Sequence, residues 1–450
     1  MGGSDPDPLI LLSLSPSSLT VLRQHSLEIV HAALVAVSPE VLVRRALDTT
    51  RIANFLEGRR LRVIAAGKAS VGMLRAFRSC VSGDIVEGVA VGPTTEAVAA
   101  FGPVHWITGG HPVPDDGSQA AGEAALACAR SVTQDEALVV LLSGGASALL
   151  SAPLAGVTLE EKIQATDALL TAGVPIHELN CVRKKLSLVK GGRLAAASVG
   201  PVLTLAISDV VGPVEDDPSV IGSGPTAVDR TTAADALRVV APLAEQMPPS
   251  VMRALTRGAS KEGAGEEWSR EADLYRVVGG RADAMRGAAD AAERLGYQVV
   301  TVKEAVTGVA WEVGRRHPTM ARRIAGRRVS PVCVVSSGET TVEVVGQGRG
   351  GRNQELALAA VPAMADWGGL AVLASVGTDG VDGPTDAAGA LVDTASAARA
   401  SAQGLDVERS LADNDAYTFF DGLGDLVRTG PSGTNVGDLQ VLLSSGVDDE

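Results

Sequence analysis

The sequence contains few aromatic residues, and this scarcity limits the kind of core that it can form. Phe, Trp and Tyr make up 3% of the 450 residues, whereas 46% are hydrophobic and 51 residues are glycine. Small aliphatic side chains must therefore fill the interior, and so many glycines are typical of an α/β protein with tight turns. A chain of this length exceeds one ordinary hydrophobic core, so we expect two or three domains.

Cysteine and histidine are also scarce, and neither shows a metal-binding pattern. The four cysteines, Cys80, Cys128, Cys181 and Cys333, lie far apart and include no CxxC pair. The six histidines show no spacing typical of metal ligands. We therefore predict reduced, mostly buried thiols and a cytoplasmic protein.

An excess of basic residues is absent too, since the net charge is −14. This charge argues against a nucleic-acid-binding protein, so any anion site must be a local basic pocket. No basic residue precedes the apolar stretch at residues 9–14, so we expect no signal peptide. The apolar window at residues 137–159 is interrupted by Gly144, Gly145 and Pro153, which favours a buried parallel strand over a membrane span.

Strand-like and helix-like stretches alternate along the chain, which predicts βαβ units with mainly parallel sheets. A helical region at residues 18–57 precedes strands at 61–66, 88–91, 104–107, 137–142 and 202–207, with helices at 70–80, 118–132, 159–172 and 176–197. Residues 261–271, which are charged and contain glycine, are the expected linker. After it come strands at 274–278, 298–302 and 332–336 and helices at 282–295 and 306–324. The predicted fold class is α/β with two domains, residues 1–265 and 266–450, each a mainly parallel or mixed sheet flanked by helices.

Residues 346–355, GQGRGGRNQE, carry the strongest indication of function. They follow an extended segment at 340–345 and precede an apolar helical pattern at 356–361. Glycines in such a turn let backbone N–H groups approach an anion. Arg349 and Arg352 add planar, permanently charged donors suited to phosphate oxygens. The turn therefore predicts a phosphate site.

The same letters permit a second interpretation. The spacing of Gly346, Gly348 and Gly351 matches a dinucleotide fingerprint between a strand and a helix. Against it, the turn carries two arginines, and only Asp379 obviously ends the next strand with an acid. A nicotinamide-dependent reductase therefore stays open as an alternative.

Lys68 follows the first predicted strand, at the edge where open α/β sheets bind ligands. It could reach a phosphate, or it could be a surface lysine after a tight turn. The surrounding residues 65–70 are not a P-loop, because Arg62 stands where that motif requires glycine.

A small-residue turn follows the strand at residues 137–142. Its backbone N–H groups and the hydroxyls of Ser143 and Ser147 could cradle phosphates. Gly144 and Gly145 are equally consistent with close packing of strand against helix.

Charged residues cluster at two more places. The segment at 183–193 is basic with helical spacing, which suits either a solvated helix face or an electropositive wall facing a nucleotide. Asp209, after another strand, could hold Mg²⁺ or accept a proton from an attacking hydroxyl. Asp379, Asp382 and Asp386 resemble a calcium loop by acid count, but they lack its spacing and terminal Glu.

Taken together, these stretches resemble the class II glycerate kinases from about residue 33 to residue 443. The matching runs are AAGKAS (65–70), GGHPVPDD (109–116), LLSGGASALL (141–150), NCVRKKLSLVKGGRLA (180–195), the region 208–226, GETT (338–341), GRGGRNQELALA (348–359), GTDGVDGPTDAAGA (377–390) and GPSGTNVGDL (430–439). The last four resemble the C-terminal MOFRL domain of that family. Residues 213–215 look inserted relative to the family pattern.

The resemblance implies ATP-dependent phosphorylation of D-glycerate, preferably to 2-phosphoglycerate, with Mg²⁺ or another divalent cation. It implies an active site in a cleft between a Rossmann-like N-terminal domain and a MOFRL-type C-terminal domain. Lys68 and Arg352 fall on motif positions expected to be catalytic, and Asp209 is a candidate base and metal ligand. The expected substrate-binding residues are Glu339, Arg349, Asn353 and Asp379, and the expected cofactor-binding residues are Ser143, Gly144, Gly145, Ser147, Lys190, Gly348, Gly350 and Gly351.

Three hypotheses follow. The preferred one is a glycerate kinase, acting as a monomer or homodimer without nucleic-acid or membrane partners. The second is an NAD(P)H-dependent hydroxypyruvate reductase, a label that this family sometimes carries. The third is a phosphate-ligand sensor without catalytic activity.

Overall fold

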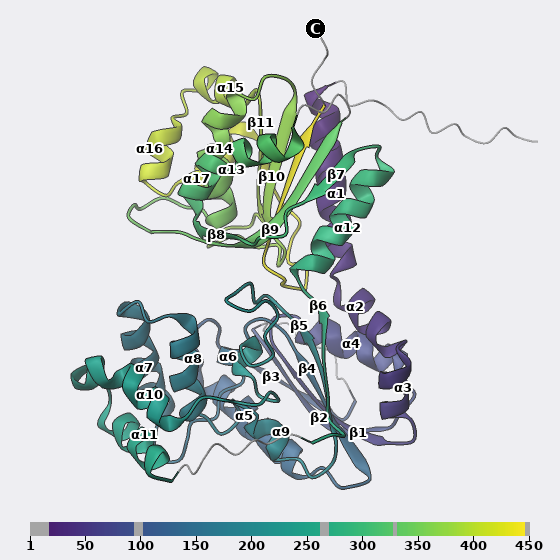
Figure 1. Cartoon of the computed structure of the whole chain (residues 1–450), viewed down its shortest axis with the longest axis vertical. Coiled ribbons are helices and arrows are strands. Elements are labelled where there is room, and N and C mark those ends of the chain that lie inside the picture. Colours follow the sequence, from purple (N-terminus) through teal and green to yellow (C-terminus); the bar gives the residue numbers. More distant parts are fainter. Residues whose placement is uncertain (1–17, 94–101, 262–269, 327–330, 446–450) are drawn as a thin grey trace, which may run out of the picture. The chain divides into compact units, whose positions relative to one another are not determined.

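A computed structural model describes residues 18–93, 102–261, 270–326 and 331–445 (Figure 1). The chain forms two compact units. The N-terminal unit comprises residues 36–281 together with the short segment 432–437, and the C-terminal unit comprises residues 1–35, 282–431 and 438–450. Each unit is an α/β structure, as the strand and helix pattern predicted.

The N-terminal unit is built on a sheet of six strands, all parallel, in the order β3-β2-β1-β4-β5-β6. The strands are β1 (Arg60–Ala66), β2 (Ile85–Gly92), β3 (Val104–Thr108), β4 (Glu136–Leu142), β5 (Val202–Ile207) and β6 (Leu274–Gly279). This order reverses direction between β1 and β4, which is the arrangement of doubly wound nucleotide-binding folds. All seven residues of β4 are buried, which confirms the predicted buried strand in the apolar window.

Helices cover both faces of this sheet. On one face, α5 (Asp116–Arg130), α6 (Ala146–Leu149) and α9 (Arg193–Ala196) bury small residues against β1, β2 and β4. α2 (Pro39–Leu47) contacts β6, and α4 (Ser70–Cys80) contacts β1 and β2, while α3 (Thr50–Leu56) follows α2 (Figure 1). The N-terminus of α5 is capped by Asp115, whose carboxylate accepts a hydrogen bond from the Ser118 amide at 2.8 Å.

Four helices of the N-terminal unit form a hydrophobic cluster of their own. They are α7 (Leu159–Thr171), α8 (Ile176–Lys185), α10 (Ala233–Val240) and α11 (Pro249–Lys261). Leu169, Val182, Val240 and Leu255 are buried among them. In Figure 1 these helices lie together to one side of the sheet.

The C-terminal unit contains a mixed sheet in the order β12-β11-β10-β13-β9-β7, with β8 paired to β9. Its strands are β7 (Gln298–Thr301), β8 (Val306–Val309), β9 (Val332–Thr341), β10 (Ala371–Gly377), β11 (Gly389–Asp393), β12 (Leu426–Val427) and β13 (Asp438–Ser444). β7 and β8 run parallel to β9, and the other pairs are antiparallel.

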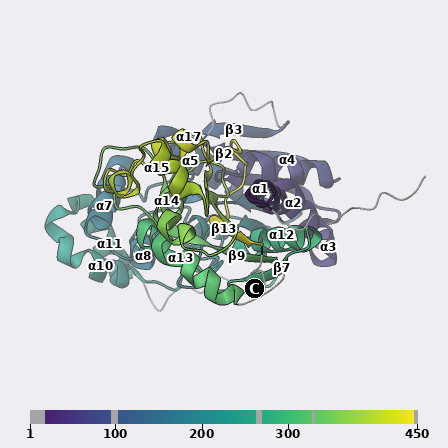
Figure 2. The ribbon, with the colours of Figure 1, turned by 90° about the horizontal axis from the view of Figure 1, so that it is seen from above.

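Alternation along β9 divides the core of the C-terminal unit into two layers. Val332 and Val334 face a layer with α13 (Ala310–Ala325), α14 (Arg352–Ala365) and α17 (Ala416–Leu423). Cys333 and Val335 face the opposite layer, formed by α1 (Leu19–Ala36) and α12 (Arg281–Arg294). Figure 2 shows these two helix groups on opposite sides of β9 and β13. Two further short helices are α15 (Ser396–Ala402) and α16 (Val407–Ala412).

Three predicted elements differ from the structure. The predicted helix at 176–197 is α8 and α9 separated by a turn, where Gly191 and Gly192 adopt positive φ angles of 59° and 80°. The predicted helix at 306–324 begins with strand β8, because its β-branched start pairs with β9. The extended segment predicted at 340–345 is the end of β9 followed by a loop.

The division between the units also differs from the predicted one at residue 265. β6 lies beyond that point in sequence, yet it pairs with β5 and completes the first sheet. The contacts therefore place the division between Arg281 and Ala282. Most of the predicted linker at 261–271 lies outside the described residues.

Among the described residues, no single helix is both long enough and apolar enough to cross a membrane. Within that part of the chain, only α1 and α2 taken together reach the length and composition that a span requires.

Candidate functional site

The strand order of the N-terminal sheet reverses between β1 and β4, which marks one edge of the sheet as the candidate site. Ligands of open α/β sheets bind beyond the carboxyl ends of the strands at such a switch point. Lys68 follows β1, Ser143 follows β4 and Asp209 follows β5. The topology therefore brings the predicted residues of three separate motifs to the same edge of one sheet.

The turn after β1 is docked on the turn after β4. The Lys68 amide donates to the carbonyl of Gly144 at 2.9 Å, and the Ala69 amide donates to the hydroxyl of Ser143 at 3.0 Å. Gly67 has a φ of 126°, and a Cβ there would collide with Ser143. Ser143 is fully buried, so its hydroxyl holds the two turns together rather than facing a ligand.

Two glycines let charged side chains gather around the second turn. A Cβ on Gly144 would collide with the carboxylate of Asp209. A Cβ on Gly145 would lie 2.9 Å from the His111 ring and 3.4 Å from Cγ of Lys68. The backbone at Gly144 and Gly145 is thus surrounded by the side chains of Lys68, His111 and Asp209. This arrangement supports the close-packing interpretation of the two glycines, and it places a polar site beside them.

Asn435 completes this group from the far end of the sequence. Its side-chain amide donates to Oδ2 of Asp209 at 3.0 Å. It belongs to the segment 432–437, which packs as part of the N-terminal unit. The sequence interpretation missed Asn435 and His111. Asn435 lies in the run GPSGTNVGDL and His111 in the run GGHPVPDD. Both runs carried the family resemblance, so they could have pointed to these two residues.

Lys190 and Ser147 lie next to this group in a buried polar network. The ammonium of Lys190 donates to the Ser147 carbonyl at 2.6 Å and to the Leu150 carbonyl at 3.4 Å. The hydroxyls of Ser147 and Ser223 are 2.7 Å apart, and Ser223 donates to the side-chain carbonyl of Asn180 at 3.1 Å. Lys190 is 1% exposed. Its ammonium is therefore enclosed by protein acceptors and does not lie on a solvated helix face, which was one of the two interpretations of this basic segment.

In the C-terminal unit, the predicted catalytic residue Arg352 is the first residue of α14 and is held by two carboxylates. Its Nε donates to Asp438 at 3.0 Å, and its Nη1 donates to Glu339 at 2.8 Å. Asp438 is fully buried, and burial raises its pKa to about 6 against the opposing effect of Arg352. Burial acts to lower the pKa of Arg352. The negative charges of Asp438 and Glu339 have the larger combined effect, so the pKa of Arg352 is raised.

Another carboxylate occupies the start of α14. Asp382 accepts hydrogen bonds from the amides of Asn353 at 3.1 Å and Gln354 at 2.8 Å. These are the unpaired donors at the start of the helix, where a bound anion would otherwise sit. Asp382 therefore satisfies two of the free amides at the start of α14.

The glycine-rich loop before α14 is likewise satisfied from within the protein. Five consecutive amides, from Val345 to Arg349, donate to side-chain or backbone oxygens of residues 413–415. A Cβ on Gly348 would collide with Asp415, and one on Gly351 would collide with Asp382. Neighbouring chain segments therefore lie against these glycines, and the cofactor-binding role of Gly348, Gly350 and Gly351 stays a prediction.

The four predicted substrate-binding residues divide into two groups. Glu339 contacts Arg352, and buried Asn353 donates to Asp438 at 2.9 Å, so these two belong to the arginine cluster. The guanidinium of Arg349 instead stacks 4.0 Å above the Tyr417 ring. The carboxylate of Asp379 accepts a hydrogen bond from the Val381 amide at 3.2 Å in the turn after β10.

The candidate metal ligand is Asp209. In the parts of the chain that the structure describes, no three His, Cys, Asp or Glu side chains lie close enough to hold a metal ion by themselves. Mg²⁺ bound to a nucleotide needs only one or two protein carboxylates, because phosphates and water supply its other ligands. The single carboxylate of Asp209 fits that requirement.

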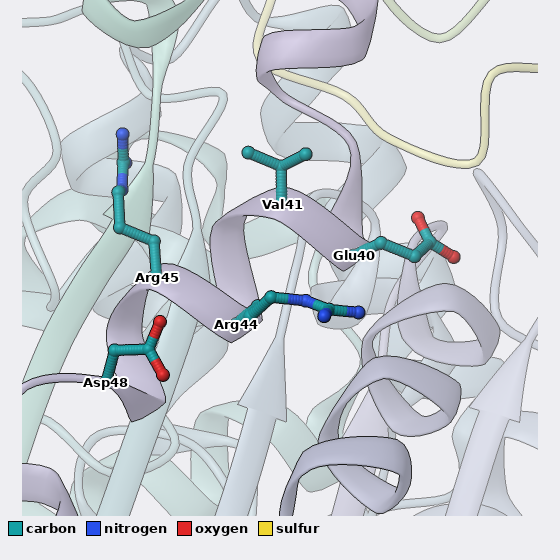
Figure 3. A pocket seen from close by; sticks show the side chains of 5 residues that line it. All are labelled: Glu40, Val41, Arg44, Arg45 and Asp48. Carbon is teal, nitrogen blue, oxygen red and sulfur yellow. The ribbon is translucent and has the colours of Figure 1, made fainter.

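A surface pocket lies on α2, away from these motifs in sequence. It is lined by Glu40, Val41, Arg44, Arg45 and Asp48 (Figure 3). Arg45 also donates to the Val278 carbonyl at 2.8 Å, which ties α2 to β6. None of the predicted site residues lines this pocket, so we assign it no part in the reaction.

Comparisons with known proteins agree with the two-unit architecture. Residues 25–256 match a domain of unknown function, DUF4147, and residues 332–438 match the MOFRL family. A glycerate 2-kinase from Pyrococcus horikoshii is 35% identical, over 94% of this chain and 97% of that protein. An Agrobacterium vitis protein with the provisional name hydroxypyruvate reductase is 38% identical, over 94% of each.

A solved structure extends the likeness to three dimensions. The crystal structure of a glycerate kinase from Thermotoga maritima superposes with a TM-score of 0.84 and 34% sequence identity. The match covers 94% of this chain and 100% of that one. The likeness therefore includes both units and not a single shared domain.

Proposed function

This chain belongs to the glycerate kinase family built from DUF4147 and MOFRL domains, and from that membership we propose that it transfers the γ-phosphoryl group of ATP to D-glycerate. We further propose 2-phosphoglycerate as the product. The observation that carries the proposal is the gathering of Lys68, Asp209 and His111 around Gly144 and Gly145 at the switch point of the N-terminal sheet.

Lys68 is the proposed electrostatic catalyst in this group. Phosphoryl transfer spreads negative charge over the oxygens of the transferred group, so positioned cations supply much of the acceleration. The backbone of Lys68 is fixed by its hydrogen bond to Gly144, while its long side chain can follow the moving phosphoryl group. A fixed backbone and a flexible side chain with a charged end suit that role.

Asp209 is the proposed base or metal ligand. Its carboxylate is oriented by the amide of Asn435, and a positioned carboxylate can accept the proton of the attacking glycerate hydroxyl. If Mg²⁺ accompanies the nucleotide, it supplies positive charge beside the phosphates, and Asp209 is the residue that would hold it.

Arg352 stays a predicted catalytic residue. Two carboxylates fix its guanidinium, and the side chain keeps 31% of its surface exposed. Transition-state arginines in phosphoryl transfer act through such fixed, permanently charged donors.

The experiment that tests the proposal is phosphorus NMR of the product formed from ATP and D-glycerate. A phosphomonoester resonance coupled to the proton on C2 supports 2-phosphoglycerate, and one coupled to the C3 protons contradicts the assigned position. No phosphorylated glycerate at all, with ATP and Mg²⁺ present, contradicts the kinase itself.

The alternative reductase deserves a test because a relative carries that name. Its predicted dinucleotide loop has its amides bonded to residues 413–415, which does not favour it. Oxidation of NADH or NADPH by hydroxypyruvate in the presence of the purified protein would revive the reductase hypothesis.

A further inference from the structure

Three cations in the N-terminal unit lie buried or half-buried without a carboxylate partner. Lys162 on α7 is 5% exposed, and its ammonium donates to the Ser151 hydroxyl at 2.8 Å. Lys190 donates to oxygens of Ser147 and Leu150. The side chain of Arg183 on α8 makes no hydrogen bond, ion pair or ring contact with any residue that the structure describes. None of the three forms an ion pair within that part of the chain.

The neighbouring cations of the same basic segment are satisfied. Lys184 and Lys185 pair with Asp229 at 3.5 Å and 3.2 Å. The guanidinium of Arg193 donates to the Lys184 carbonyl at 2.6 Å and to the Ser187 carbonyl. Arg183 therefore stands out within its own helix, because a half-buried guanidinium without acceptors loses hydration and gains nothing in return.

The three charges are close enough to affect one another. Burial lowers the pKa of Lys162 to about 7, and the charge of Arg183 adds to that effect. Burial also lowers the pKa of Lys190, with further contributions from Lys162 and Arg183. The lowered pKa values show that the positive charge here lacks a counter-ion, and a bound anion would favour the protonated form of both lysines.

The cluster is continuous with the site around Gly145. Asn180 lies one turn before Arg183 on α8, so both residues share a face of the helix. Asn180 accepts from Ser223, whose hydroxyl lies 2.7 Å from that of Ser147. Ser147 in turn lies two residues after Gly145, and it is Gly145 that lies beside Lys68 and His111.

We propose that Arg183, supported by Lys162 and Lys190, binds the phosphate chain of the nucleotide. The charge balance favours this ligand over a carboxylate. One permanently charged arginine and two lysines that a bound anion would protonate match a group with several negative charges, whereas glycerate carries one. Arg183 offers the planar donor fork that pairs with phosphate oxygens. This inference rests on the proposed kinase activity for its biological ligand, but the site itself is defined without it.

The test measures binding by calorimetry with the full-length protein, using inorganic tripolyphosphate and ADP as probes and D-glycerate as a separate arm. Arg183→Gln should weaken tripolyphosphate and ADP binding by about 10-fold to 100-fold, the scale of hydrogen bonds to charged groups. Arg183→Lys should fall between this variant and the natural protein. Arg257→Gln, which removes an exposed arginine on α11, should bind both probes normally.

A stability measurement separates ligand binding from a structural role. Since Arg183 has no partner among the described residues, Arg183→Gln should leave the melting temperature of the ligand-free protein unchanged or raise it. A clear drop in melting temperature for that variant would make Arg183 a structural residue and overturn the proposal.

Other outcomes also decide the matter. Three results would each contradict the proposal. Arg183→Gln and the natural protein could bind tripolyphosphate equally well, neither could bind it, or the variant could lose D-glycerate binding alone. If the phosphate probes bind through Arg183 but phosphorus NMR finds no phosphorylated glycerate, the kinase activity fails while the anion site stands.

Discussion

The buried carboxylate of Asp438 accepts a hydrogen bond from Nε of Arg352 at 3.0 Å. Glu339 binds Nη1 of the same guanidinium at 2.8 Å. Two of the three guanidinium nitrogens therefore have carboxylate partners, while Nη2 has no hydrogen bond to a residue in the described ranges. Such an arginine has a fixed orientation and retains donors on one nitrogen, which is the form expected of a group that contacts a phosphoryl oxygen.

Replacing Arg352 tests that role directly. We expect Arg352→Ala to lower kcat by ~10³ or more, the scale of transition-state arginines. Arg352→Lys should recover little of the loss, because a point charge does not reproduce the planar fork. The measurement is steady-state release of ADP with saturating substrates. Arg315→Ala, which removes an exposed ion pair with Glu408 in the same unit, should keep normal turnover, and normal turnover in Arg352→Ala would refute the assignment.

Acidification should act on the same pair. The pKa of Asp438 is raised to about 6, so this carboxylate gains a proton as the pH falls through that value and then no longer holds Arg352 by charge. We expect kcat to fall on the acid side with an apparent pKa near 6. Asp438→Asn should lower kcat at neutral pH and remove this acid limb. If kcat of Asp438→Asn still falls on the acid side with the same apparent pKa, another group causes the decrease.

The placement of Lys68 and Asp209 could be predicted from sequence because both follow a buried strand. In a doubly wound sheet, that local position fixes the edge at which a residue lies. Asn435 could not be found in this way, since it approaches Asp209 from 226 positions away along the chain. No local pattern carries that information, and only the folded chain brings the two side chains together.

The glycine-rich run at 346–351 shows the limit of a local pattern. Its letters suggested a phosphate-binding turn, but the oxygens that accept from the amides of residues 346–349 belong to residues 413–415, which lie 65 to 68 positions further on. Glycine is required wherever another backbone approaches closely, whether that backbone or a ligand is the neighbour. The spacing of the glycines therefore predicted that another group lies close to this backbone. It could not show whether that group is a ligand or another part of the chain.

The contact between Asn435 and Asp209 should matter for catalysis. Asp209→Asn removes the charge of the proposed base and should lower kcat by ~10² to 10⁴. Asn435→Ala should lower it by ~10-fold, because the carboxylate loses one charge-assisted hydrogen bond. Asn435→Asp, which places a second negative charge beside Asp209, should be worse than Asn435→Ala. An equal effect of the two Asn435 variants would indicate that the contact does not orient Asp209.

The packing role of the glycine-rich loop gives a stability prediction. A Cβ on Gly348 would collide with Asp415, so Gly348→Ala should lower the free energy of unfolding by ~1–3 kcal/mol, as overpacking does. Gly422→Ala serves as the control, because the nearest neighbour of its Cβ would be a flexible leucine side chain at 3.3 Å. Urea denaturation checks both. Unchanged stability of Gly348→Ala together with weaker nucleotide binding would instead support the predicted cofactor-binding role of the loop.

His317 should make the stability of the C-terminal unit depend on pH. Its Nε2 lies 2.9 Å from the Ser336 hydroxyl, which donates onward to Gln440, and its Nδ1 has no partner within the described residues. Nε2 therefore carries the proton, and protonating Nδ1 would bury an unpaired charge. Burial lowers the pKa of His317 to about 4.

Between pH 6.5, the ordinary histidine pKa, and about pH 4, the unfolded chain binds a proton at this residue that the folded chain does not. The free energy of unfolding should therefore fall as the pH falls through this window, by about 3 kcal/mol in total from this one group. Urea denaturation at pH 7.5 and pH 4.5 measures the change. His317→Asn, which does not titrate, should lose less stability than the natural protein over the same interval. An identical loss in both proteins would mean that His317 is not buried as a neutral side chain.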